Sequence, residues 1–138
     1  MYRLDFDEAT ANSIGGDVAL IANRWTTITV RGDMDEDMVW RRLMTTVQRH
    51  FEDIEVRDRA AGVIRTNWVT RQFNQETVRT RLEIRPDFSQ ERLAYEVRLT
   101  SEIRANWGGS ESWRRWDRVL RRYENTISEI QTAVAGGG

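Results

Sequence analysis

Side chains that could bind a metal ion or act as catalysts are sparse in this sequence. The run Asp33–Asp37 places acids at alternate positions, as the opening of a calcium-binding loop does. The sixth and twelfth positions of such a loop need glycine and glutamate, but here they are Met38 and Met44. His50 is the only histidine and there is no cysteine, which removes the usual ligands of a zinc site. We therefore expect a protein that is not an enzyme and uses no metal or other cofactor.

Arginine and glutamate share one face of two predicted strands. The cations are Arg79, Arg81, Arg85, Arg98 and Arg104, and the acids are Glu83, Glu96 and Glu102. This face could bind an anionic partner, or its charges could pair across the strands and neutralise one another. Acidic and basic residues number 22 and 21, which disfavours nonspecific nucleic-acid binding. Cross-strand pairing is the favoured interpretation, and Arg79, Arg81 and Arg98 are kept as candidate partner-binding residues.

The six tryptophans suggest two further kinds of site. Trp107 lies in a glycine-containing loop, where an exposed indole is typical of a partner contact. The tryptophans that fit core packing on predicted strands or helical stripes are Trp40, Trp68, Trp113 and Trp116. If the domain instead encloses an apolar cavity, Trp68, Tyr95 and Trp113 are the residues that we expect to line it.

Three predicted strands organise the chain, at residues 63–74, 77–85 and 93–104. In the last two, apolar and charged residues alternate strictly, which predicts an antiparallel sheet with one apolar face and one charged face. The apolar face must be covered, so the flanking segments should supply a layer of helices.

The flanking segments fit that requirement. A β-branched strand is predicted at 25–31, a helix at 35–51 with Asp33 or Asp35 as its cap, and a short strand at 54–56. A final helix is predicted from Ser110 to about Ala133. The order β-α-β-β-β-β-α indicates a two-layer α+β domain of helix-grip type, an antiparallel sheet covered on one face by two helices. Residues 1–24 are predicted to form an ordered arm, 25–134 a single domain, and 135–138 a flexible glycine tail.

One stretch resembles a known family. A helix that contains Val39–Leu43 is followed by Phe51–Asp58, and Asp58 and Gly62 then occupy an Asp-x-x-x-Gly turn before the next strand. This pattern is similar to the repeating domain of the BamC family of bacterial outer-membrane lipoproteins. The resemblance implies a helix-grip fold, no catalytic residues and an accessory role in outer-membrane assembly. The cysteine that anchors that family to lipid has no counterpart in this sequence.

These observations lead to one expected function and one alternative. The expected function is a non-enzymatic protein–protein interaction domain of a cell-envelope lipoprotein or envelope-complex subunit, at the periplasmic face of the bacterial outer membrane, with other envelope proteins as partners. The membrane would be reached only through a lipid anchor that lies outside this sequence, and a cytoplasmic location stays open. The alternative is a small apolar ligand bound between the C-terminal helix and the sheet.

Overall fold

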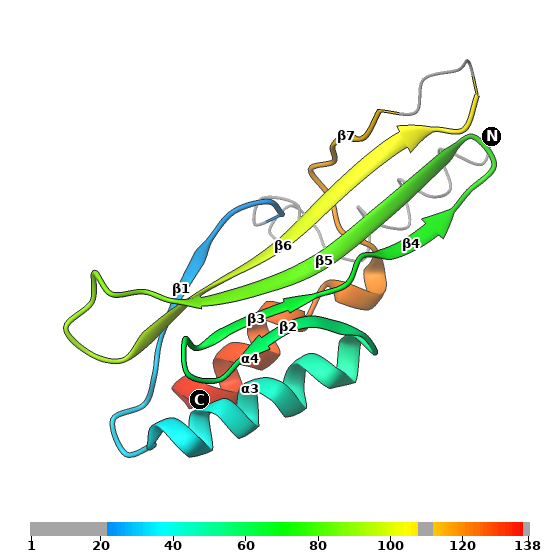
Figure 1. Ribbon diagram of the computed structural model, residues 1–138. Helices are drawn as coiled ribbons and strands as arrows, with labels where there is room; N and C mark the ends of the chain where they lie inside the picture. Colours follow the sequence, from blue (N-terminus) through cyan, green and yellow to red (C-terminus); the bar gives the residue numbers. More distant parts are fainter. Residues whose placement is uncertain (1–21, 108–111, 137–138) are drawn as a thin grey trace.

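A long β-hairpin is the central element of the domain (Figure 1). The computed structural model describes residues 22–107 and 112–136. Its elements are, in chain order, β1 (Thr26–Thr29), α3 (Glu36–His50), β2 (Ile54–Asp58), β3 (Val63–Thr66), β4 (Val69–Gln72), β5 (Glu76–Pro86), β6 (Ala94–Ala105), β7 (Arg114–Arg115), the 3-10 turn η1 (Arg121–Tyr123) and α4 (Thr126–Ala135).

β5 and β6 pair antiparallel along their whole length, from Glu76 opposite Ala105 to Pro86 opposite Tyr95. Their inward residues are buried and include Val78, Leu82 and Leu99, while the charged residues between them point to the other face. This confirms the alternation that the sequence predicted. One face of the hairpin therefore belongs to the core, and the other is the charged outer face of the sheet.

Each strand of the hairpin pairs with two short strands, which lie one after the other along its outer edge. β3 and then β4 pair with β5, while β1 and then β7 pair with β6, and β2 extends the sheet beyond β3 (Figure 1). The predicted strand at 63–74 is thus two strands separated by Asn67 and Trp68. At that interruption the Thr66 hydroxyl accepts a hydrogen bond from the Leu82 N–H at 3.0 Å, which replaces a missing backbone partner.

Asn23 fills the corresponding gap between β1 and β7. Its backbone N–H donates to the Leu99 carbonyl at 2.7 Å, and its side-chain oxygen accepts from the Ser101 N–H at 2.9 Å. Its amide nitrogen donates to the Trp116 carbonyl at 2.7 Å. Asn23 has a positive φ of 64°, a conformation that asparagine tolerates better than most residues. One side chain thereby completes the edge of β6 where no strand runs.

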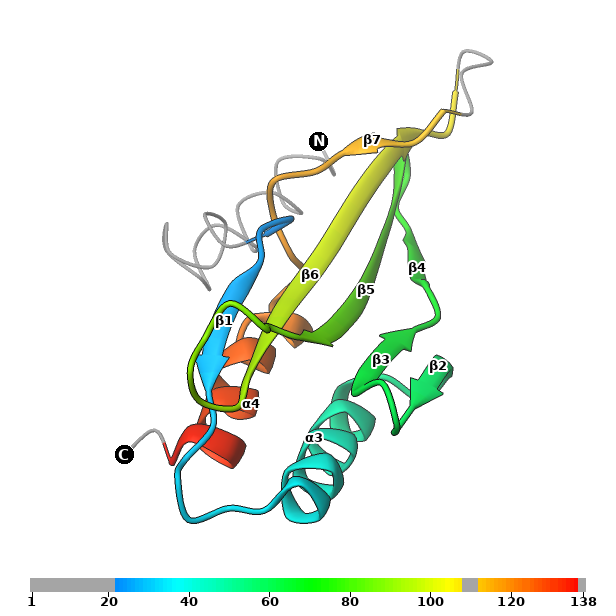
Figure 2. The ribbon, with the colours of Figure 1, turned by 60° about the vertical axis from the view of Figure 1, so that its left-hand side comes forward.

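The two helices of the described residues lie on the same side of the sheet and cover its apolar face (Figure 2). Asp35 caps α3 as predicted, its side chain accepting a hydrogen bond from the Met38 N–H at 2.8 Å. The two helices place buried side chains in the same core as the sheet: Val39, Leu43 and Val47 from α3, and Ile127, Ile130 and Val134 from α4. The rings of Phe51 and Tyr123 stack at 4.8 Å between centroids, which joins the end of α3 to the segment before α4.

The C-terminal helix is shorter than the sequence indicated. Ser110 lies outside the described residues, and between 112 and 125 the chain forms β7 and η1 instead of a continuous helix. β7 pairs with β6, with Arg115 opposite Glu102. Pairing with the hairpin therefore decides the conformation of this segment, although its apolar residues are spaced as in a helix. The structure confirms an α+β fold with two helices over one face of an antiparallel sheet. Because α4 has only 10 residues, the helix-grip type stays a prediction.

The predicted terminal segments fall largely outside the described residues. Of the expected arm at 1–24, only 22–24 are described, and Ala22 belongs to the core. Of the expected tail at 135–138, Ala135 is the last residue of α4, and Gly136 caps that helix with a positive φ of 65°. Gly62 in the β2–β3 turn has a positive φ of 73°, which explains a glycine there through backbone geometry alone.

Candidate functional site

The outer face of the β5–β6 hairpin carries a row of ion pairs. Arg79 lies opposite Glu102, Glu83 opposite Arg98, and Arg85 opposite Glu96. The closest nitrogen–oxygen distances of these pairs are 2.5, 2.8 and 2.7 Å. Cross-strand neighbours of opposite charge are the arrangement that stabilises a sheet face. The prediction that the acids face the arginines is therefore confirmed.

Arginines of this outer face stack on tryptophan rings, and two of the rings, Trp68 and Trp113, share Arg79. Trp68 has the guanidinium carbons of Arg79 and Arg81 at 4.2 and 4.3 Å from its ring centroid. Trp113 has Arg79 and Arg104 at 4.1 and 4.6 Å. Each distance is within the range of a cation–π interaction. Arg79 thus contacts both rings and also donates to Glu102, which makes it the centre of the stack.

A second stack lies nearer the other end of the hairpin. The guanidinium carbons of Arg85 and Arg98 lie 3.9 and 4.3 Å from the ring centroid of Trp25. We call the two groups together the Arg–Trp ladder, which comprises Trp25, Trp68 and Trp113 with Arg79, Arg81, Arg85, Arg98 and Arg104. Planar guanidinium groups stack on aromatic faces in a way that lysine cannot. The ladder therefore stiffens the hairpin along its outer face.

Two arginines of the ladder have no acidic partner among the described residues. Arg81 lies opposite Thr100 and Arg104 opposite Thr77, so neither faces a carboxylate across the strands. The Nε atom of Arg81 is buried without a hydrogen-bond partner in the described part of the chain. Of the three predicted partner-binding arginines, Arg79 and Arg98 are thus already paired, while Arg81 contributes excess positive charge.

Trp107 follows β6 at the open end of the β5–β6 hairpin, beside the turn between β4 and β5, and the residue is 69% exposed. Its indole N–H donates to the Asn74 carbonyl at 3.2 Å. The preceding residue, Asn106, donates from its backbone to the Gln75 carbonyl at 2.9 Å and from its side chain to the Phe73 carbonyl at 2.7 Å. The Thr77 hydroxyl donates to the Asn106 side-chain oxygen at 2.5 Å. An exposed ring is thus held by a network of hydrogen bonds.

The residues predicted to line an apolar cavity are not brought together. Trp68 and Trp113 lie on the outer face with Arg79, on the side of the sheet away from the helices. Tyr95 is buried in the core, and burial raises the pKa of its phenol above the usual range. The expectation that Trp68 and Trp113 pack in the core is corrected in the same way, because their stacking partners are charged.

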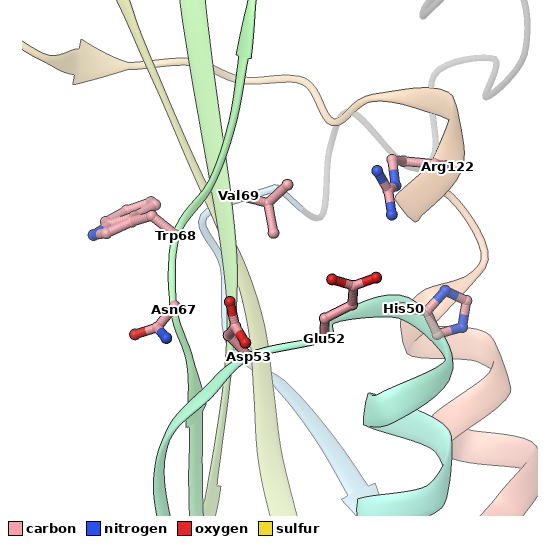
Figure 3. Close-up of a pocket in the computed structure, with 7 residues that line it drawn as sticks. All are labelled: His50, Glu52, Asp53, Asn67, Trp68, Val69 and Arg122. Carbon is pink, nitrogen blue, oxygen red and sulfur yellow. The ribbon is translucent and has the colours of Figure 1, made fainter.

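A polar cleft of about 300 Å³ lies beside the C-terminal end of α3 (Figure 3). Glu52 and Arg122 project toward it, whereas the ring of Trp68 points away from both. The Nε2 atom of His50 lies 3.2 Å from a Glu129 carboxylate oxygen. No serine, threonine or cysteine is among the described residues that line this cleft, and in 22–107 and 112–136 no three His, Asp or Glu side chains are placed to hold a metal ion. The cleft offers polar contacts without an assembled catalytic set.

Sequence reasoning missed the part that Trp25 plays. Its position at the start of a β-branched run marked a strand, but its face depends on the register with β6, in which Thr26 lies opposite Val97. That register places Trp25 on the outer face beside Arg98, and no local signal reveals it. Phe88, 90% exposed in the β5–β6 loop, was visible in the sequence as part of a turn and was not considered a contact.

Comparison with known proteins leaves the function open. Neither a scan against models of protein families nor a search of curated proteins found a match. Within the described residues, no helix combines the length and the apolar character needed to cross a membrane. The features that bear on function are the outer face of the sheet and the open end of the β5–β6 hairpin around Trp107.

Proposed function

We propose that this protein is a non-enzymatic protein–protein interaction domain that contacts its partner through Trp107 at the open end of the β5–β6 hairpin. The observation that carries this proposal is Trp107, a residue that is 69% exposed while its indole N–H is bonded to the Asn74 carbonyl. A large aromatic side chain that is already fixed loses little conformational entropy on binding. Such residues are typical of the few positions that dominate the energy of an interface.

The surroundings of Trp107 favour a partner of acidic character. Arg104 lies three residues before it and contacts the Trp113 ring, and Arg71 lies over Phe73 at 5.1 Å. Neither Arg71 nor Arg104 forms an ion pair with another described residue. A partner that offers an apolar pocket for Trp107 and carboxylates around it would therefore match both the ring and the charge.

The resemblance of residues 39–69 to the BamC family supports a partner from the bacterial cell envelope. On that basis we propose that the domain belongs to a lipoprotein or a subunit of an envelope complex on the periplasmic face of the outer membrane. The Arg–Trp ladder supports the proposal physically, because a stiff hairpin presents Trp107 in one orientation. The ladder itself acts as support, since its tryptophan rings are already in contact with guanidinium groups.

A pull-down from envelope extracts with matched variants tests this proposal. The baits are the unaltered protein, Trp107→Ala and Phe88→Ala, because Phe88 is an even more exposed aromatic residue at the opposite end of the hairpin. We expect one acidic envelope protein to be captured by the unaltered protein and by Phe88→Ala, but not by Trp107→Ala, and the purified partner to bind in the same order. Equal capture by all three baits, or capture of nothing, would contradict the proposal.

A further inference from the structure

A groove of about 510 Å³ runs between α3 and α4 on the solvent-exposed side of the helical layer. It is distinct from the open end of the hairpin around Trp107 and from the outer face of the sheet. The residues that define its chemistry are Arg41, Arg42, Thr45 and Arg49 from α3, and Glu129 and Thr132 from α4. Its volume lies in the range of about 300 to 1,000 Å³ that is usual for small-molecule sites.

Two sets of contacts join the helices along the groove. At one end the Arg42 guanidinium donates to the Ala133 carbonyl at 3.1 Å, where a cation also suits the negative end of the α4 dipole. At the other end Arg49 and His50 lie 4.0 and 3.2 Å from the same Glu129 oxygen. These bridges hold the helices at a fixed separation, so the groove exists without a ligand.

Hydrogen-bond donors outnumber acceptors between these ends. Arg41 and the hydroxyls of Thr45 and Thr132 form no hydrogen bond or ion pair with other described residues. Arg42 and Arg49 each use one nitrogen and keep further donors. Glu129 is the one carboxylate among the described lining residues, and Arg49 and the His50 ring already lie beside it. A ligand in this groove therefore meets unused guanidinium and hydroxyl donors, a set that suits an oxyanion.

We propose that this groove binds a phosphate group, carried either by a small soluble molecule or by a lipid headgroup. The guanidinium groups and the Thr45 hydroxyl come from α3 and the Thr132 hydroxyl comes from α4, so both helices contribute donors, which suits a tetrahedral anion better than a planar carboxylate. Arginine forks and hydroxyls are common partners of phosphate oxygens. Arg41 is the key residue, because its guanidinium has no other role in the described structure.

Isothermal titration calorimetry with inorganic phosphate, at constant ionic strength, tests the proposal. Arg41→Gln should weaken phosphate binding by about tenfold, the loss expected for one charge-assisted contact. Glu129→Gln should strengthen it, because the change removes the carboxylate that repels the anion. Arg57→Gln is the matched control, since Arg57 is exposed on β2 without an ion pair to a described residue, and it should bind phosphate as the unaltered protein does.

A second arm distinguishes the source of the phosphate. Flotation with vesicles of phosphatidylcholine, with or without phosphatidic acid, reports binding to a lipid headgroup. Binding to phosphatidic acid vesicles that Arg41→Gln abolishes would assign the groove to a lipid, and binding of free phosphate alone would assign it to a soluble ligand. No binding in either arm, or equal effects of Arg41→Gln and Arg57→Gln, would overturn the proposal. Circular dichroism of each variant checks that the fold is intact.

Discussion

Replacing Arg79 tests whether the Arg–Trp ladder stiffens the hairpin. Its guanidinium lies between the rings of Trp68 and Trp113, at 4.2 and 4.1 Å, and its Nε and Nη2 atoms donate to Glu102 at 2.8 and 2.5 Å. A cation–π contact contributes about 0.5 to 1 kcal/mol at an exposed site and about 2 when desolvated. The Arg79 side chain is 24% exposed, so the two contacts lie between these limits.

Arg79→Lys keeps the charge and most of the aliphatic stem but loses the planar group. We expect it to lower the free energy of unfolding by about 1 kcal/mol. Arg79→Met also removes the ion pair, which adds about 0.5 to 1 kcal/mol for a partly exposed pair, so a total loss of about 2 kcal/mol is expected. Urea titration followed by far-ultraviolet circular dichroism measures both changes.

Two controls decide whether the ladder is responsible. Arg57→Lys and Arg57→Met alter an exposed arginine of β2 and should change stability by less than about 0.5 kcal/mol. Combining Arg79→Met with Trp113→Ala should show a coupling energy of about 1 kcal/mol, because both changes remove the same stack. If the Arg79 and Arg57 variants have equal stability, or if the coupling is absent, the reasoning about the ladder is refuted.

Three further predictions concern single residues. Asn23→Gly keeps the left-handed backbone but removes the side-chain bonds to Ser101 and Trp116, so urea titration should show a loss of about 1 to 3 kcal/mol; an unchanged midpoint would contradict the bridging role. Tyr123→Phe removes a buried hydroxyl without a described partner and should raise stability by about 1 kcal/mol. Burial raises the pKa of the Tyr123 phenol. The contribution of Tyr123 to the free energy of unfolding should therefore be fully present below the unfolded-state pKa of about 10 and be lost as pH rises above that value. The phenylalanine variant should lose less stability over the same rise in pH. Hydrogen bonds from Ser89, followed by that from Thr27, lower the pKa of Asp87, so its stabilising effect should be present above the unfolded-state pKa of about 4 and disappear as pH falls through the lowered value. Asp87→Ala should therefore be less stable than the unaltered protein at neutral pH and match it in strong acid, as urea titrations at both pH values would show.

The hairpin was predictable because its signals are local and repeated. Strict alternation assigned a face to each residue of β5 and β6, and the acids on that face made cross-strand pairing with Arg79 and Arg98 the expected arrangement. The cap of α3 was predictable for the same reason, since Asp35 directly precedes a stripe of apolar residues. Trp107 was identified as exposed from its place in a glycine-containing loop, and the structure agrees.

The segment after the hairpin was not predictable from spacing. Trp113 and Trp116 recur at a helical interval, but the Trp113 ring stacks on Arg79 and Arg104, while the Trp116 N–H donates to the Ser101 carbonyl at 3.0 Å. These partners lie on distant strands, and such contacts override local helical preference. The groove between α3 and α4 escaped prediction likewise, because it depends on how two separate helices pack.

Site-specific photo-crosslinking in living cells tests the central claim most directly. A photoreactive phenylalanine analogue is placed at Trp107 in one variant and at Phe88 in another, and the crosslinked proteins are identified by mass spectrometry. The proposed function predicts a single acidic envelope protein attached at position 107 and absent at position 88. The same adducts at both positions, or no adduct at position 107, would contradict the claim that the open end of the β5–β6 hairpin is the contact surface.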